Sequence, residues 1–252
     1  MHRIYHLHIP RTSGKSVCDA LYGTFVNAGL LRKINNTGTS RLMYDKKSFT
    51  DIPFVSGHFA TNPVSVEDEK FDVFSFVREP ISHYMSIASY VCANSDRVMS
   101  SEFMEEFLYG YMTPFGANEL FSNSGNLQSK MLFCRIGLAD SSVVSLTDDD
   151  VQSRENIVFI ESDMPSEEEI KNKIENMFIF TLDNRHIGIE WLRKKILLDH
   201  GLKLDQSIKN VSNSSFKNNF TPDISHVREI LSRCDIDSMV YHLVRSGESA
   251  NL

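Results

Sequence analysis

The sequence predicts an α/β fold with a central, mostly parallel sheet and a largely helical C-terminal half. Short apolar runs alternate with helical patterns through the first ninety residues, which is the arrangement of strands joined by crossover helices. Beyond that point the patterns are mostly helical. The chain has 252 residues, of which 41% are hydrophobic, so it is long and apolar enough to bury a core as a single domain over residues 1–252.

The first ninety residues hold three predicted strands and two predicted helices. Residues 4–9 form a short run with apolar and aromatic residues, and residues 71–77 are almost continuously apolar, as in a buried parallel strand. A shorter strand is predicted at 54–55. Apolar residues at helical spacing predict a helix over 17–31, and a proline suits the first turn of a helix over 80–91.

The rest of the chain is predicted to be helical apart from one short apolar strand at 157–160. Apolar spacing marks a helix over 184–200 and predicts that Ile187, Trp191, Ile196 and Leu198 point inward. An acidic first turn marks the helix over 167–177. The other predicted helices cover residues 101–111, 119–133, 223–234 and 236–244.

Charge and cysteine content limit the partners and the location that we expect. The chain carries 26 Lys and Arg against 33 Asp and Glu, and a net charge of −7 disfavours a protein that coats nucleic acid. It does not exclude an anionic ligand, because a local site can oppose the overall sign. No run approaches the about 18–20 apolar residues of a spanning helix, and the N-terminus is too polar for a signal peptide. The four cysteines form no C-x-x-C pair, so we expect a cytoplasmic protein with reduced thiols and no membrane span.

The turn after the first predicted strand is small and cationic, with the sequence His-Ile-Pro-Arg-Thr-Ser-Gly-Lys-Ser-Val. A helix that begins after such a turn directs backbone N–H groups at one spot, which suits an anion. Arg11 and Lys15 add positive charge, and Thr12 and Ser16 add hydroxyl donors. A P-loop for a nucleoside triphosphate needs a glycine where this chain has Ile9. The structural alternative is a solvated turn with two surface cations.

A second strand-to-helix turn, with the sequence Phe-Val-Arg-Glu-Pro, places Arg78 at the carboxyl end of the 71–77 strand. Ser82 and Ser86 lie one turn apart on the next helix, so both can face this strand end. Ligands of open parallel sheets bind at the carboxyl ends of the strands, so the two turns predict two adjacent anion sites. A nucleotide with phosphates at both its 5′ and 3′ positions needs that arrangement. In the structural alternative, Arg78 forms an ion pair with Glu79 or a neighbour.

Both turns resemble motifs of one enzyme family. Residues 8–16 resemble the 5′-phosphosulfate loop of sulfotransferases that use 3′-phosphoadenosine 5′-phosphosulfate (PAPS), in the branch that includes heparan sulfate 2-O-sulfotransferase and related carbohydrate enzymes. Residues 76–86 resemble the 3′-phosphate motif of that family, and segments 126–132, 209–212 and 237–241 are similar to its later parts in the expected order. The resemblance implies a P-loop-like three-layer fold. It also implies metal-free, in-line transfer of a sulfuryl group from PAPS to a hydroxyl of a glycan, lipid or small metabolite.

The resemblance also implies a role for each residue of the two turns. Arg11 and Lys15 would stabilise the charge that builds on the leaving phosphate, and Arg78 with Ser86 would hold the 3′-phosphate. The family usually has Lys where this chain has Arg11, Gly where it has Ser13, and a small hydroxyl residue where it has Lys15. The residues expected to bind PAPS are Arg11, Thr12, Ser13, Gly14, Lys15, Ser16, Arg78 and Ser86.

His58 is the expected general base, because it follows the short strand at 54–55 and resembles the Gly-His segment in which the family has a catalytic histidine. A structural histidine at a strand end is the alternative. Glu79, Glu102 and Glu119 are the carboxylates that could take the same role.

The sequence is also compatible with two other functions, and one predicted helix face could contact a ligand. A nucleoside kinase or NTPase could use the Gly-Lys-Ser turn, and a nucleotide-binding relative could have lost catalysis with Arg11 in place of Lys. On the predicted helix over 119–133, Asn126 and Lys130 share a face that could contact a ligand. Gln128 is expected on a solvated face of the same helix.

Overall fold

The structure is a computed structural model, and it describes residues 3–9, 11–28, 54–57, 71–109, 125–133, 164–204 and 220–250. Within these ranges the first ninety residues hold three strands and two helices, in the order strand, helix, strand, strand, helix, and the later elements are mostly helical, as predicted. The elements in chain order are β1 (Arg3–Leu7), α1 (Gly14–Asn27), β2 (Phe54–Gly57), β3 (Phe71–Val77), α3 (Pro80–Asn94), α4 (Ser101–Tyr109), α6 (Leu127–Phe133), α7 (Glu167–Glu175), β4 (Phe178–Thr181), α8 (Arg185–His200), α9 (Ile224–Arg233) and α10 (Asp235–Ala250).

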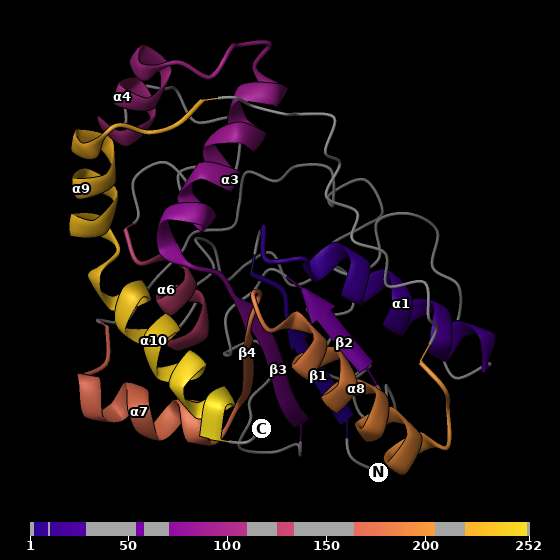
Figure 1. Cartoon of the computed structure of the whole chain (residues 1–252). Coiled ribbons are helices and arrows are strands. Elements are labelled where there is room, and N and C mark those ends of the chain that lie inside the picture. The colour runs from indigo at the N-terminus through magenta and orange to yellow at the C-terminus, as the bar shows by residue number, and fades with distance from the viewer. Residues whose placement is uncertain are drawn as a thin grey trace, which may run out of the picture.

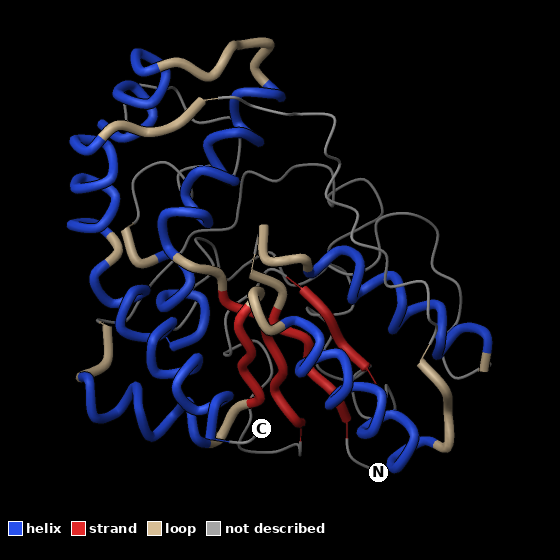
Figure 2. The backbone as a smooth tube through the Cα atoms, in the orientation of Figure 1, coloured by secondary structure: helices blue, strands red, loops and turns tan. Residues whose placement is uncertain are grey.

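The described strands form one parallel sheet in the order β2-β1-β3-β4. β1 pairs on both sides, so Tyr5 is aligned with Val55 of β2 and with Val73 of β3. From β1 the chain first adds β2 on one side, and it then adds β3 and β4 on the other side of β1. The turns that lead into α1, α3 and α8 lie at the carboxyl edge of the strands (Figure 2). Because α1 and α3 pack on opposite faces, the ends of β1 and β3 form a topological switch point.

Helices cover both faces of the sheet (Figure 1). Side chains alternate along β3, so that Phe74 and Phe76 pack with α1 and α8, whereas Val73 and Val77 pack with α3, α6, α9 and α10. Helix α8 approaches the sheet at Gly188, where a Cβ atom would lie 2.8 Å from the Phe76 ring. A glycine is therefore needed for α8 to pack this closely.

β4 is a strand that the sequence analysis did not predict. Phe178–Thr181 pairs with β3 and is the last of the described strands in the sheet order, with Phe180 aligned with Phe76. The ring centroids of Phe178 and Trp191 lie 4.3 Å apart, so β4 packs directly against α8, the helix that follows it. The strand predicted at 157–160 lies outside the described residues.

The predicted helices that fall within the described ranges are present, with small shifts of their ends. Of the helix predicted over 119–133, α6 covers Leu127–Phe133, and residues 119–124 lie outside the described ranges. The predicted inward orientation of Leu198 is wrong, because its side chain is 82% exposed. Ile196 is buried as predicted, and Leu192 is buried as well; both pack in the cluster that holds Phe74 and Phe76 of β3.

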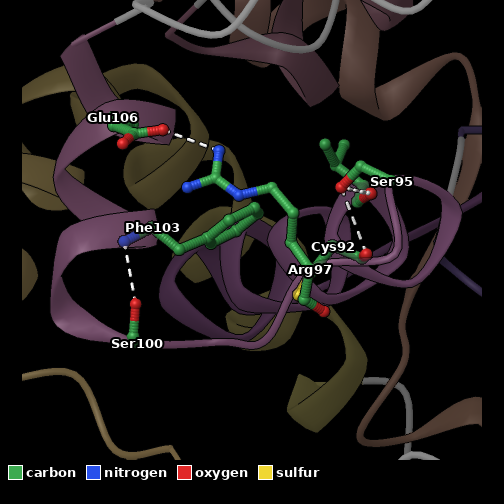
Figure 3. A network of polar contacts seen from close by, with 7 residues as sticks. Cys92, Ser95, Arg97, Ser100, Phe103 and Glu106 are labelled. Carbon is green, nitrogen blue, oxygen red and sulfur yellow. Dashed lines mark hydrogen bonds and ion pairs between the residues drawn. The ribbon is translucent and has the colours of Figure 1, made fainter.

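Hydrogen bonds and an ion pair around Arg97 stabilise the connection between α3 and α4 (Figure 3). Its Nη1 donates to Glu106 at 2.6 Å, and its guanidinium carbon lies 5.0 Å from the centre of the Phe103 ring. The Cys92 thiol donates to the Arg97 carbonyl oxygen at 2.9 Å, and Ser100 Oγ accepts from the Phe103 N–H near the start of α4. Arg97 is thus an arginine with a carboxylate partner of its own.

Candidate functional site

Two turns that carry arginines meet at the carboxyl ends of β1 and β3. Arg11 follows β1, and its Nε donates to Ser86 Oγ of α3 at 3.1 Å. The guanidinium carbon of Arg11 also lies 5.3 Å from the centre of the Tyr90 ring. Arg78 follows β3, and its Nη1 donates to the Arg11 carbonyl oxygen at 3.5 Å, the long limit of hydrogen bonding. The structure therefore brings together three predicted site residues, Arg11, Arg78 and Ser86.

No carboxylate of the described residues lies within ion-pair distance of Arg11 or Arg78, although the charges of Glu79 and Asp183 act on Arg78 from farther away. The Glu79 carboxylate instead accepts from the N–H groups of Ile81 at 3.0 Å and Ser82 at 2.7 Å, and so caps α3. Burial, and after it the nearby charge of Arg11, lowers the pKa of Arg78. An anion between the two guanidinium groups would relieve this repulsion.

The turn after β1 has an unusual backbone. Arg11 and Ser13 have φ angles of 66° and 69°, in the left-handed region that glycine adopts most readily. The buried Thr12 hydroxyl donates to the Ile9 carbonyl at 2.8 Å, so this predicted ligand-binding group stabilises the turn itself. The Ser16 hydroxyl donates to the Ser13 carbonyl at 3.0 Å. The first turn of α1 leaves N–H groups without partners in the helix. Turn and helix together therefore direct hydrogen-bond donors toward the space at the carboxyl ends of the strands.

Replacing Ser13 with glycine is expected to stabilise the protein. A residue with a Cβ costs about 1–2 kcal/mol in the left-handed conformation, and part of this gain is offset because glycine is freer in the unfolded chain. We expect a net gain of about 1 kcal/mol and a rise of about 2–4 °C in the melting temperature, measured by circular dichroism. Ser89→Gly, in the interior of α3, is the matched control and should destabilise by about 0.5 kcal/mol. A lower melting temperature for Ser13→Gly would contradict the assigned strain.

Helix α8 adds a third arginine that the sequence analysis missed. Arg185 is the first residue of α8, and its Nη2 donates to Ser16 Oγ at 2.7 Å. The side chain is partly buried, and burial lowers its pKa. The contact joins residues 169 positions apart, so no local motif marks it. The one sequence pattern that could have indicated Arg185 is a cation shortly after a strand. It was not recognised because β4 itself was not predicted.

Gln128 is buried, so the prediction of a solvated helix face is wrong. Its side chain is 1% exposed, and its Oε1 accepts from the Arg78 N–H at 2.8 Å. Its Nε2 donates to the Arg78 carbonyl at 2.9 Å. Asn126 lies just before α6, and its side chain contacts the start of α10. The site therefore includes a residue that acts on the backbone of Arg78.

Other predicted site residues lie outside the described part of the chain. This applies to His58, to Glu119 and to the side chain of Lys15, whose backbone lies in the first turn of α1. β2 ends at Gly57, so His58 directly follows a strand that ends at the same edge as β1. Glu102 is described and is exposed on α4. The assignment of His58 as general base stays a prediction.

Comparisons with known proteins do not identify a family. In the described ranges, no group of three or more His, Cys, Asp or Glu side chains could hold a metal ion. Nor is any helix in those ranges long and apolar enough to cross a membrane. No protein-family model matches the sequence, and a search of the curated proteins finds no significant match.

Proposed function

We propose that the chain is a PAPS-dependent sulfotransferase that transfers a sulfuryl group to an acceptor hydroxyl. The observation that carries the proposal is the contact between the two turns, in which Arg11 reaches Ser86 and Arg78 reaches the backbone of Arg11. Two cationic turns side by side at a switch point fit a ligand with negative charge at two positions, such as a nucleotide phosphorylated at 3′ and 5′. Helices on both faces of the parallel sheet agree with a P-loop-like three-layer fold.

The donors at the site suit the two ends of such a nucleotide. Arg78 and Ser86 would bind the 3′-phosphate, since a guanidinium can hold two phosphate oxygens at once. The backbone N–H groups of the β1 turn and of the first turn of α1, with Lys15 and Ser16, would bind the 5′ end. Arg11 would lie between these ends, because its guanidinium contacts α3 and its backbone belongs to the β1 turn.

The proposed chemistry asks the protein mainly to position groups and to neutralise charge. Bound PAPS supplies a sulfuryl group whose S–O bond to the 5′-phosphate breaks as a new S–O bond to the acceptor forms. Arg11 and Lys15 would neutralise the charge that gathers on the leaving phosphate. His58 would take the proton of the acceptor hydroxyl, and the acceptor is a glycan, a lipid or a small metabolite.

Binding of adenosine 3′,5′-bisphosphate is the first prediction of this proposal. The folded chain is expected to bind one equivalent of this nucleotide in a calorimetric titration, because it carries the phosphate at each position that the two turns would hold. Transfer of labelled sulfate from PAPS to a panel of hydroxyl compounds then tests the reaction. A folded sample that does not bind the bisphosphate would show that the proposal is wrong.

A binding and turnover assay with ATP and magnesium distinguishes a sulfotransferase from the alternative class, a nucleoside kinase or NTPase. A nucleoside kinase or NTPase that uses the turn before α1 would bind and turn over ATP in the presence of magnesium, without any preference for a 3′-phosphate. The Ser16 hydroxyl already accepts from Arg185, whereas a P-loop uses that hydroxyl on the metal. Bisphosphate binding with no transfer to any acceptor would indicate a binding protein without catalysis.

A further inference from the structure

The side chain of Gln128 makes a two-bond bridge to the backbone of Arg78. The amide accepts from the Arg78 N–H at 2.8 Å and donates to the Arg78 carbonyl at 2.9 Å. These bonds continue the pairing of β3 by one residue beyond Val77, in the way that a neighbouring strand would. Because both backbone polar groups of Arg78 are held, the direction in which its side chain leaves the backbone is also restricted.

A buried carboxylate on α10 holds Gln128 in turn. Asp237 is 2% exposed, and it accepts from the Gln128 N–H at 3.2 Å and from the Ser129 N–H at 2.7 Å. The Ser129 hydroxyl donates to the same carboxylate at 2.6 Å. These bonds satisfy N–H groups at the start of α6, which have no partner within the helix. The position of Gln128 therefore depends on α10.

The starts of α6 and α10 cap each other. Asn126 Oδ1 accepts from the N–H groups of Ile236 at 2.9 Å and Asp237 at 3.0 Å, and its Nδ2 donates to Asp235 at 2.8 Å. Asn126 has a φ of 59°, which asparagine tolerates better than most residues. Side chains from each helix start thus satisfy the backbone of the other, and the pair forms one hydrogen-bonded unit next to Arg78.

We propose that Gln128 is a positioning residue that orients Arg78 for a 3′-phosphate, and that Asp237 keeps Gln128 in place. The inference rests on the proposed function, because the 3′-phosphate is the ligand that Arg78 would meet. A guanidinium must have a defined direction to bind two phosphate oxygens together. Gln128 uses both ends of its amide on the Arg78 backbone, so it acts on the ligand through Arg78.

The substitution Gln128→Met tests this role, because methionine fills a similar volume but lacks the amide donor and acceptor. The measurement is the preference for a 3′-phosphate: the affinity for adenosine 3′,5′-bisphosphate divided by that for adenosine 5′-monophosphate, both by calorimetry. We expect this preference to fall about tenfold while the affinity for the 5′-monophosphate is unchanged. Ser129→Ala is the matched control, since Ser129 bonds to the same Asp237 but not to Arg78, and it should retain the preference.

An unchanged preference in Gln128→Met overturns the inference, and so does an equal loss of affinity for both nucleotides, which indicates general distortion. In an Arg78→Ala background the Gln128 change should have no further effect, and additive losses also overturn the inference. If the Met variant does not fold, Gln128→Glu keeps an acceptor for the Arg78 N–H and removes the donor, and an unchanged preference there has the same meaning. A folded wild-type chain that binds neither nucleotide overturns the proposed function itself.

Discussion

Replacing Arg78 with alanine is expected to weaken the binding of adenosine 3′,5′-bisphosphate about a hundredfold, or roughly 2.7 kcal/mol. Arginine and phosphate form paired, charge-assisted hydrogen bonds, and Arg78 is partly buried, so water would replace these bonds poorly. The turn should keep its shape, because Gln128 holds the backbone of residue 78 and the Glu79 carboxylate caps α3. Calorimetric titration of the wild type and the variant measures the effect.

Arg97→Ala is the matched control for this prediction. Arg97 is also an arginine close to α3, but it lies on the connection to α4 and pairs with Glu106 of α4 (Figure 3), so its loss should leave nucleotide affinity unchanged. Arg78→Lys should give an intermediate loss, since lysine keeps the charge but not the two-pronged geometry. If both alanine variants bind the bisphosphate as tightly as the wild type, the turn after β3 does not bind the anion.

Replacing Asp237 with leucine is expected to reduce the free energy of unfolding by about 3 kcal/mol. Leucine leaves the N–H groups of Gln128 and Ser129 and the Ser129 hydroxyl without their acceptor in a buried place. For a chain of this size the melting temperature should fall by roughly 6–12 °C. Asp235→Ala removes an exposed carboxylate that accepts one bond from Asn126, and it should cost less than about 1 kcal/mol. Similar losses for the two variants would contradict the role of burial.

The stability of this junction is also expected to depend on pH. Burial raises the pKa of Asp237, although bonds from Ser129 and Gln128 act in the opposite direction. A carboxyl group whose pKa is raised on folding stabilises the protein below its unfolded pKa of about 4, and this contribution is lost as the pH rises through the folded pKa. Relative to Asp237→Asn, which cannot titrate, the wild type should therefore lose stability as the pH rises above about 4. Urea unfolding at several pH values measures the difference, and a constant difference would contradict it.

The two turns of the site could be predicted because each is a local pattern. An apolar run, a small polar turn and a helix start occupy consecutive residues around both Arg11 and Arg78. Their proximity also follows from general rules, since parallel strands end at a common edge. β4 could not be predicted in this way. Its four residues are too few to show a period, and they form a strand because the free edge of β3 lies beside them.

The contacts between distant segments were beyond prediction for a different reason. Gln128 is a polar residue in a helix, a pattern that normally indicates solvent, and its burial is tolerated because the Arg78 backbone satisfies both ends of its amide. The partner lies fifty residues away, so helical spacing carries no sign of it. Leu198 shows the opposite case, an apolar residue that remains in solvent because Leu192 and Ile196 already fill the contact of α8 with the sheet.

The sheet divides the apolar interior into two separate clusters, one shared with α1 and one shared with α3. The turn that carries Arg11 leads into α1, which packs in the first cluster, and the turn that carries Arg78 leads into α3, which packs in the second. An anion held by both turns would therefore bind to the two halves at once. Local opening of either half would release the anion, and the binding free energy therefore adds to the cost of both openings. Amide hydrogens in α1 and α3 would then exchange more slowly together, although these helices lie on opposite sides of the molecule.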